Sequence, residues 1–155
     1  MQLTKNFSLV EFIDPAIYKE FGDKSIRFLD SRIPLIAQEV KDILSSHYGK
    51  NVRVTINGNL NGHTYTESGL RQINTTTGSK TSDHKYGRAI DIKGSFDDGS
   101  IIPIKDIYFI ITKTDNLSKL MKIGLTTIED INFTATWLHL STRYTLSKGL
   151  NIVQP

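Results

Sequence analysis

Apolar positions recur with a helical period between residues 31 and 47, and this pattern predicts one long amphipathic helix. The apolar stripe consists of Ile33, Ile36, Ala37, Val40, Ile43 and Leu44. Gly49 follows as a natural helix stop. A short helix is also predicted near the start, because Ser8 and Glu11 have the spacing of a capping box. Pro15 is expected to end that helix, since proline disfavours a helical residue before it.

The period changes from helical to alternating in the rest of the chain. Alternation predicts strands over residues 52–57, 88–93, 125–129 and 136–142, and helical spacing predicts helices over 104–113 and 116–122. Between the first two strands lies the irregular segment 58–83, which is rich in Gly, Asn, Thr and Ser, and long loops of this kind usually have a function. Helices followed by a mostly antiparallel sheet predict an α+β fold, with one domain over residues 1–155.

Composition and charge narrow the class of protein. The 155 residues are 38% apolar and 23% charged, values typical of a soluble globular domain. The formal net charge of +3 is dispersed, which argues against nucleic acid as a partner and suits an anionic surface such as a cell wall. Apolar runs fall short of the ~20 residues that cross a bilayer, so no membrane insertion is expected. The N-terminal stretch MQLTKNFSLVEF lacks the features of a signal peptide.

The chain has no cysteine, so a metal ion would have to be held by histidines and carboxylates. Two segments supply candidates, SDHKYGRAIDIK at 82–93 and TWLHLSTR at 136–143. His84 precedes a predicted strand, and Asp91 and His139 lie on polar strand faces, with the small residues Gly87 and Ala89 expected to leave space beside them. Two imidazoles and one carboxylate leave the fourth position of a tetrahedral zinc ion for water. The other two histidines, His47 and His63, are expected at the surface.

A set of two histidines and one carboxylate is also found in non-haem iron oxygenases. Those enzymes typically place the first histidine and the carboxylate two residues apart. Here His84 and Asp91 are seven residues apart. The spacing therefore favours zinc over iron.

A longer pattern resembles a known family of zinc peptidases that cut the stem peptides of peptidoglycan. It comprises Ser82, His84, Gly87, Ala89 and Asp91, followed by Trp137 and His139. The family contains D-alanyl-D-alanine carboxypeptidases and dipeptidases and the L-alanyl-D-glutamate endopeptidases of phage endolysins, and hedgehog signalling domains share its fold. The segments NFSLVEF and GSKTSDH are also similar to phage and bacterial members. The resemblance, over about residues 6–143, implies a hedgehog-like α+β fold and a Zn²⁺ ion bound by His84, Asp91 and His139.

The resemblance implies a catalytic base as well. In the family a Glu or Asp lies three or six residues before the last histidine ligand, but here those positions hold Thr136 and Phe133. Glu129, at the end of the predicted strand LTTIED, resembles the family base, with an insertion of about four residues before Trp137. A carboxylate there would take a proton from the attacking water and pass it to the leaving amine. Asp130 remains the alternative base.

Three further residues resemble the family's substrate contacts. The turn Ser68-Gly69-Leu70-Arg71 is similar to a Ser-Gly-Tyr-Arg turn whose arginine polarises the scissile carbonyl or holds the substrate. The alternative for Arg71 is a surface arginine in a polar loop. Ser82 is expected to bind substrate, or otherwise to order its turn, and Trp137 is expected to line the cleft, or otherwise to pack in the core.

The sequence therefore predicts a zinc metallopeptidase that acts on peptidoglycan stem peptides, as an endolysin or a virion-associated cell-wall hydrolase of a bacteriophage. Such a chain would start in the host cytoplasm and act at the cell wall, or belong to the virion. The alternative is a structural or binding module that contacts other virion proteins and keeps the fold, with or without the metal, but has no catalytic activity. The residues leave open which peptide bond is cut.

Overall fold

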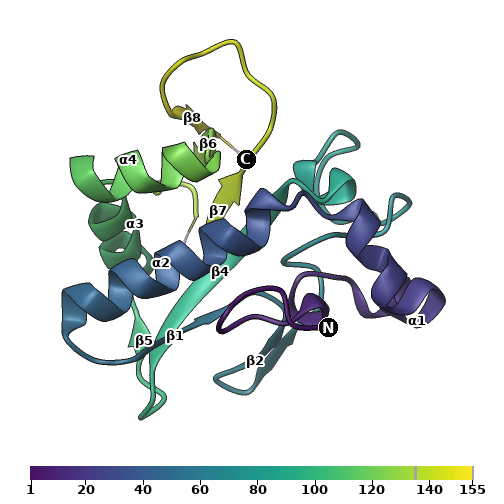
Figure 1. Ribbon diagram of the computed structural model, residues 1–155, viewed down its shortest axis with the longest axis horizontal. Coiled ribbons are helices and arrows are strands. Elements are labelled where there is room, and N and C mark those ends of the chain that lie inside the picture. Colours follow the sequence, from purple (N-terminus) through teal and green to yellow (C-terminus); the bar gives the residue numbers. More distant parts are fainter. Residues whose placement is uncertain (135, 155) are drawn as a thin grey trace.

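The computed structural model describes residues 1–134 and 136–154 and has an α+β fold (Figure 1). Its helices are α1 (Pro15–Phe21), α2 (Arg32–Tyr48), α3 (Ile104–Ile111) and α4 (Thr114–Ile123), with 3₁₀ helices at Leu9–Glu11, Gly22–Phe28 and Asp83–Tyr86. Its strands are β1 (Val52–Thr55), β2 (Gly58–Leu60), β3 (His63–Tyr65), β4 (Ala89–Phe96), β5 (Ile101–Ile102), β6 (Thr127–Glu129), β7 (Leu138–Ser141) and β8 (Asn151–Val153).

The main sheet is mixed, with the strand order β1-β4-β7-β6-β8 and with β5 paired to β4. The neighbours of β4 and the β6–β7 pair are antiparallel, as the sequence predicts, whereas β8 runs parallel to β6. Strands β2 and β3 form a separate antiparallel hairpin. Because side chains alternate between the two faces of a sheet, every second side chain of the central strands β4 and β7 points to the same face.

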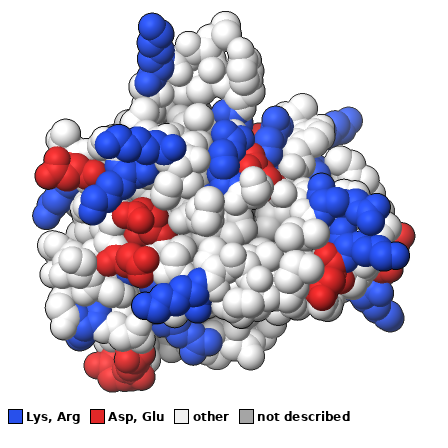
Figure 2. All heavy atoms as spheres, in the orientation of Figure 1, with Lys and Arg blue, Asp and Glu red and all other residues white. Residues whose placement is uncertain are grey.

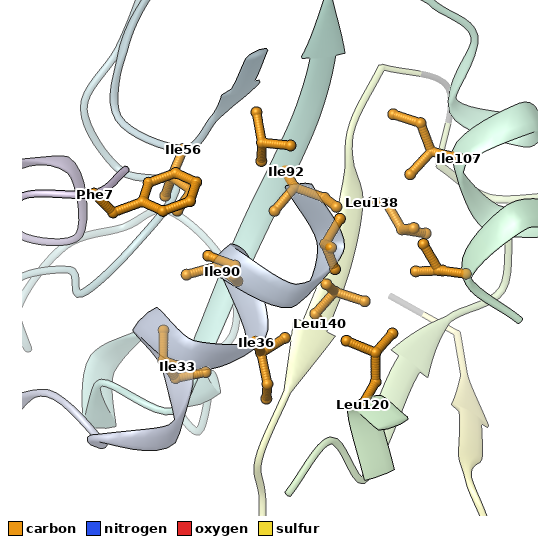
Figure 3. Packing of buried hydrophobic residues seen from close by; sticks show 14 of the residues in the cluster. Phe7, Ile33, Ile36, Ile56, Ile90, Ile92, Ile107, Leu120, Leu138 and Leu140 are labelled. Carbon is orange, nitrogen blue, oxygen red and sulfur yellow. The ribbon is translucent and has the colours of Figure 1, made fainter. Parts of the chain in front are cut away.

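One face of the sheet forms the hydrophobic core. In the β4–β7 register Ile90 lies opposite Leu140 and Ile92 lies opposite Leu138, and all four side chains are fully buried. Figure 3 shows these side chains packed against the apolar side of α2 and against residues of α3 and α4. Burying one such side chain contributes roughly 1.5–3 kcal/mol to the stability of the fold. The opposite face of β4 and β7 is therefore left for polar residues.

The predicted long helix is confirmed as α2, which crosses in front of β4 in Figure 1. Its whole predicted stripe is buried, and Gly49 ends the helix in the left-handed conformation with φ of 64°. The helices α3 and α4 lie beside it, whereas α1 lies at the far end of the molecule. The sheet is thus covered by α2, α3 and α4, and the expectation that the N-terminal helices as a group pack on it holds only for α2.

The start of the chain shows the predicted capping box, in a 3₁₀ helix. The backbone N–H and the hydroxyl of Ser8 both donate to the Glu11 carboxylate, at 2.7 and 3.0 Å. The prediction for Pro15 is only half right. Pro15 follows the first helix but also begins α1, where Asp14 caps the helix by accepting from the Ala16 N–H. Proline suits the first helical turn, because its missing N–H has no partner there anyway.

The segment 58–83 is less irregular than its composition predicts, because it contains the β2–β3 hairpin. Asn61 and Gly62 form its turn, both with positive φ, as a tight hairpin requires. Residues 66–82 of the segment are loop. On the face shown in Figure 2, lysines and arginines are interspersed with acidic residues. Within the described residues, the helices are all too short or too polar to cross a membrane.

Candidate metal centre

Three buried side chains that are far apart in the sequence meet at one point on the polar face of the sheet. His84 belongs to the 3₁₀ helix Asp83–Tyr86, Asp91 to β4 and His139 to β7. His84 Nε2 lies 3.2 Å from Asp91 Oδ1 and 3.1 Å from His139 Nδ1, and the last two atoms are 3.0 Å apart. Asp91 and His139 face one another directly in the β4–β7 register. This group could hold a metal ion.

The backbone sets the protonation of the His84 ring. Its Nδ1 lies 2.9 Å from the carbonyl oxygen of Gly69. Because a carbonyl can only accept, Nδ1 carries the proton and the Nε2 of the neutral ring keeps its lone pair. Metal-binding histidines are commonly held in this way through their second nitrogen. The ligand atom therefore points at Asp91 and His139 in the form that a metal needs.

Asp91 is an ionised carboxylate in this site. Burial would raise its pKa, but positive charge and hydrogen-bond donation, which His84 and His139 supply in their protonated forms, outweigh burial and lower the pKa below the usual aspartate range. Its second oxygen, Oδ2, accepts a hydrogen bond of 2.9 Å from the Arg71 guanidinium. One oxygen of Asp91 thus faces the two histidines while the other is held by a fixed cation.

The turn at residues 68–71 holds both Asp91 and His84 in place. The Asp91 N–H donates to the Ser68 carbonyl at 2.7 Å, and the Arg71 N–H donates to the His84 carbonyl at 3.1 Å. On its other side the turn packs on the N-terminal segment, where the Leu70 N–H donates to the Phe12 carbonyl at 2.7 Å. The turn is therefore fixed between the start of the chain and the ligand strand.

Gly69 is required by this packing, and we expect Gly69→Ala to destabilise the protein. A Cβ atom at this position would lie 2.2 Å from the Phe12 carbonyl oxygen, so the backbone would have to shift. Overpacking of this kind costs about 1–3 kcal/mol, and the free energy of unfolding in urea measures it. Gly149→Ala is the matched control, because a Cβ there would find its nearest neighbour at 4.0 Å. Equal stability of the two variants would contradict this prediction.

His84, Asp91 and His139 line a cleft of about 410 Å³, together with the other residues that the sequence singles out. These are Arg71, Ser82, Glu129 and Trp137. One wall consists of residues 77–83, from the loop that follows the hairpin. Trp137 is 41% exposed, so it lies in this cleft and not in the core. Ser82 is the N-cap of the 3₁₀ helix Asp83–Tyr86, where its backbone carbonyl accepts the Lys85 N–H and its side chain makes no capping hydrogen bond.

Glu129 lies next to His139 in the sheet. In the β6–β7 register Thr127 faces Ser141 and Ile128 faces Leu140, so the next position places Glu129 beside His139. Burial raises the pKa of Glu129, and the nearby His139 opposes that effect. Asp130 does not line the cleft within the described residues, and its carboxylate accepts from the backbone and side-chain amides of Asn132 at 2.9 and 2.8 Å. Of the two candidate bases, Glu129 is the one in the cleft.

Three features of the site differ from expectation or were missed. Gly87 does not make room for the ligands. It has a φ of 65°, and a Cβ there would lie 2.0 Å from the Phe28 carbonyl oxygen, so it permits close packing of a neighbouring loop.

Asp83, next to His84, is buried and pairs with Arg88 and Arg143 at 3.2 and 2.6 Å. Alternation does not identify this ion cluster, because Asp83, Arg88 and Arg143 all lie outside the strands.

The second missed feature is Lys93, which alternation places on the polar face but which is buried. Burial lowers its pKa to about 8, and the negative charge of Asp91 opposes that effect. His47 and His63 are exposed and lie outside the metal group, as expected.

No family model, curated protein or solved structure matches this chain. The interpretation of the site therefore depends on its own geometry. That geometry is a buried group of two imidazoles and one carboxylate, open to a cleft, that could hold a metal ion.

Proposed function

We propose that this chain is a zinc metallopeptidase of the hedgehog-like fold that hydrolyses peptide bonds in peptidoglycan stem peptides. The observation that carries the proposal is the convergence of His84, Asp91 and His139 from three separate elements. These are the residues for which the pattern S-x-H-x-x-G-x-A-x-D and the later W-x-H imply the same role. The setting that we propose is a bacteriophage endolysin or a virion-associated hydrolase.

The donor set fits zinc. Ligand atoms on a tetrahedral zinc ion are about 3.3 Å apart, because Zn–N and Zn–O bonds are about 2.0–2.1 Å long. The three ligand atoms here are separated by 3.0–3.2 Å. Lone pairs this close repel one another unless a proton or a cation lies among them. A zinc ion would supply Lewis-acid polarisation of the scissile carbonyl and would acidify a water molecule.

Glu129 is the residue that moves the proton. It lies in the cleft, next to His139, which in turn faces Asp91 across the β4–β7 pair. Burial raises its pKa above the ordinary glutamate value. A raised pKa suits a group that first accepts a proton from water and then donates it to the leaving amine. Arg71 holds Asp91 through one N–H and lines the same cleft, where its fixed positive charge supports oxyanion charge that develops on the substrate.

The cleft is suited to an extended peptide. Its two walls come from the loop residues 77–83 and from Glu129 and Trp137, with Val153 and Gln154 at the edge. The Glu67 carboxylate accepts from the hydroxyls of Thr75 and Thr77, both at 2.7 Å, and so fixes the start of the first wall. A preformed wall of small polar residues beside an exposed tryptophan can bind a chain that remains attached to a polymer.

We expect zinc-loaded protein to release defined stem-peptide fragments from purified peptidoglycan, whereas casein-like proteins made of L-residues should remain intact. Mass spectrometry of the fragments identifies the bond that is cut. The Glu129→Gln protein, treated identically, is the matched control for contaminating hydrolases. Equal turnover of an all-L protein would contradict the substrate class, and stoichiometric zinc without any cleavage would favour the virion structural module.

A further inference from the structure

A second cavity, of about 290 Å³, is lined by Lys93 and Thr136, which are close in sequence to Asp91 and Trp137 of the metal cleft. It lies between the β2–β3 hairpin and the segment 101–104, and its walls are largely apolar. Among the described residues that line it, Lys93 is the single Lys, Arg, Asp or Glu. The cavity thus combines mostly apolar walls, which also include Asn61, His63 and Thr136, with the positive charge of Lys93, and the role of this charge is not explained by the metal site.

Lys93 is a buried cation on which the buried Asp91 carboxylate acts without forming an ion pair. Lys93 is 3% exposed. Its Nζ donates to the Ser68 hydroxyl at 2.9 Å and to the Asp91 carbonyl at 3.3 Å. Nζ also lies 4.1 Å from the ring centroid of Tyr65. Among the described residues, no carboxylate forms an ion pair with it, and the Asp91 carboxylate is held by Arg71 and the histidines. Burying an unpaired charge is costly, so an anion beside it would be strongly favoured.

The cavity lies at a defined distance from the ligands. Lys93 and Asp91 occupy alternate positions on β4 and therefore share its polar face, about 6.5–7 Å apart along the strand. Thr136 lines the cavity and the next residue, Trp137, lines the metal cleft. An extended substrate has the same repeat as a strand, so a group bound at Lys93 would belong to a residue within about two positions of the scissile bond.

We propose that this cavity is a specificity subsite for a free carboxylate of the substrate peptide, with Lys93 as its anchor. The proposal rests on the proposed function and extends it to substrate choice. Stem peptides carry such a group, the α-carboxylate of their γ-linked D-glutamate, which in some cell walls is a neutral carboxamide. An ammonium ion that already donates to two neutral oxygens would bind the carboxylate and discriminate against the carboxamide.

The test uses two synthetic stem tetrapeptides, which differ in having the D-glutamate α-carboxyl group either free or amidated. Calorimetric titration with zinc-loaded Glu129→Gln protein measures binding without turnover. We expect the free-carboxylate peptide to bind about tenfold more tightly or better. Adding Lys93→Met should bring the ratio of the two affinities close to one, whereas Lys93→Arg should retain a preference for the carboxylate. Lys119→Met, an exposed lysine on α4, is the matched control and should leave the ratio unchanged.

The outcomes separate this inference from the proposed function. Equal affinity for the two peptides, or a preference that survives Lys93→Met, would overturn the subsite even if the unmodified protein cuts peptidoglycan. A carboxylate preference that depends on Lys93, in a protein that cuts nothing, would support the subsite and overturn the hydrolase. If Lys93→Met does not fold, the affinity ratio of the parent protein and the Lys93→Arg variant still decides.

Discussion

Replacing either His84 or His139 by alanine is expected to abolish stoichiometric metal binding. Each histidine supplies one of the three clustered donor atoms found among the described residues, and these atoms lie 3.0–3.2 Å apart in a buried site. Changes to residues behind a ligand already lower metal affinity about 10–100-fold, so the loss of a ligand is expected to exceed that range. Elemental analysis of protein prepared without chelators and calorimetric titration with zinc measure the effect.

His63→Ala is the matched control for this prediction, because His63 is an exposed histidine outside the group. It should keep one zinc ion per chain. Far-UV circular dichroism shows whether the His84→Ala and His139→Ala chains fold, as expected from a core on the opposite face of the sheet. Full metal content in both variants, or none in the unmodified protein after zinc addition, would contradict the assignment of the centre.

Glu129→Gln is expected to lower turnover at least ~10²-fold while zinc content stays normal, since this is the lower range for a positioned acid–base group. The substitution keeps the shape of the side chain but removes the basic oxygen. Glu129 lines the cleft beside His139 but is not one of the three clustered ligands, so metal binding and proton transfer should separate. Initial rates on muropeptides, together with elemental analysis, measure the two effects.

Asp130→Asn is the matched control, because Asp130 is the adjacent carboxylate and its oxygen is already occupied by the amides of Asn132. We expect a much smaller loss of turnover. If Asp130→Asn abolishes activity and Glu129→Gln does not, the base has been assigned to the wrong carboxylate. If neither substitution changes an active protein, the proton is moved by a different residue.

Local pattern was sufficient to predict the two strands that carry Asp91 and His139, but not the 3₁₀ helix that carries His84. In β4 the alternation places the Asp91 side chain on the sheet face opposite to that of Ile90 and Ile92. In β7 it places the His139 side chain on the face opposite to that of Leu138 and Leu140. Because this periodicity depends only on neighbouring residues, it can be recognised without the tertiary structure. The long stripe of α2 was predictable for the same reason.

The meeting of the ligands was not predictable from periodicity. His84 and His139 are separated by 55 positions, and their contact depends on the β4–β7 register and on the turn at 68–71. The buried state of Lys93 was missed because alternation assigns a face but does not say what covers it. Here Ser68 and Tyr65, from the preceding loop and hairpin, cover Lys93. Contacts between segments that are distant in the sequence therefore could not be predicted from local periodicity.

The long separation of the ligands has a consequence for biosynthesis. On the ribosome the chain emerges from its N-terminus, so α2, β1 and β4 can begin to pack before β7 exists. His84 and Asp91 would then be present without their third partner, and a nascent chain with two of three ligands holds a metal only weakly. Metal capture, and any hydrolytic activity that depends on it, would begin only after residue 139 has been translated and β7 has joined the sheet.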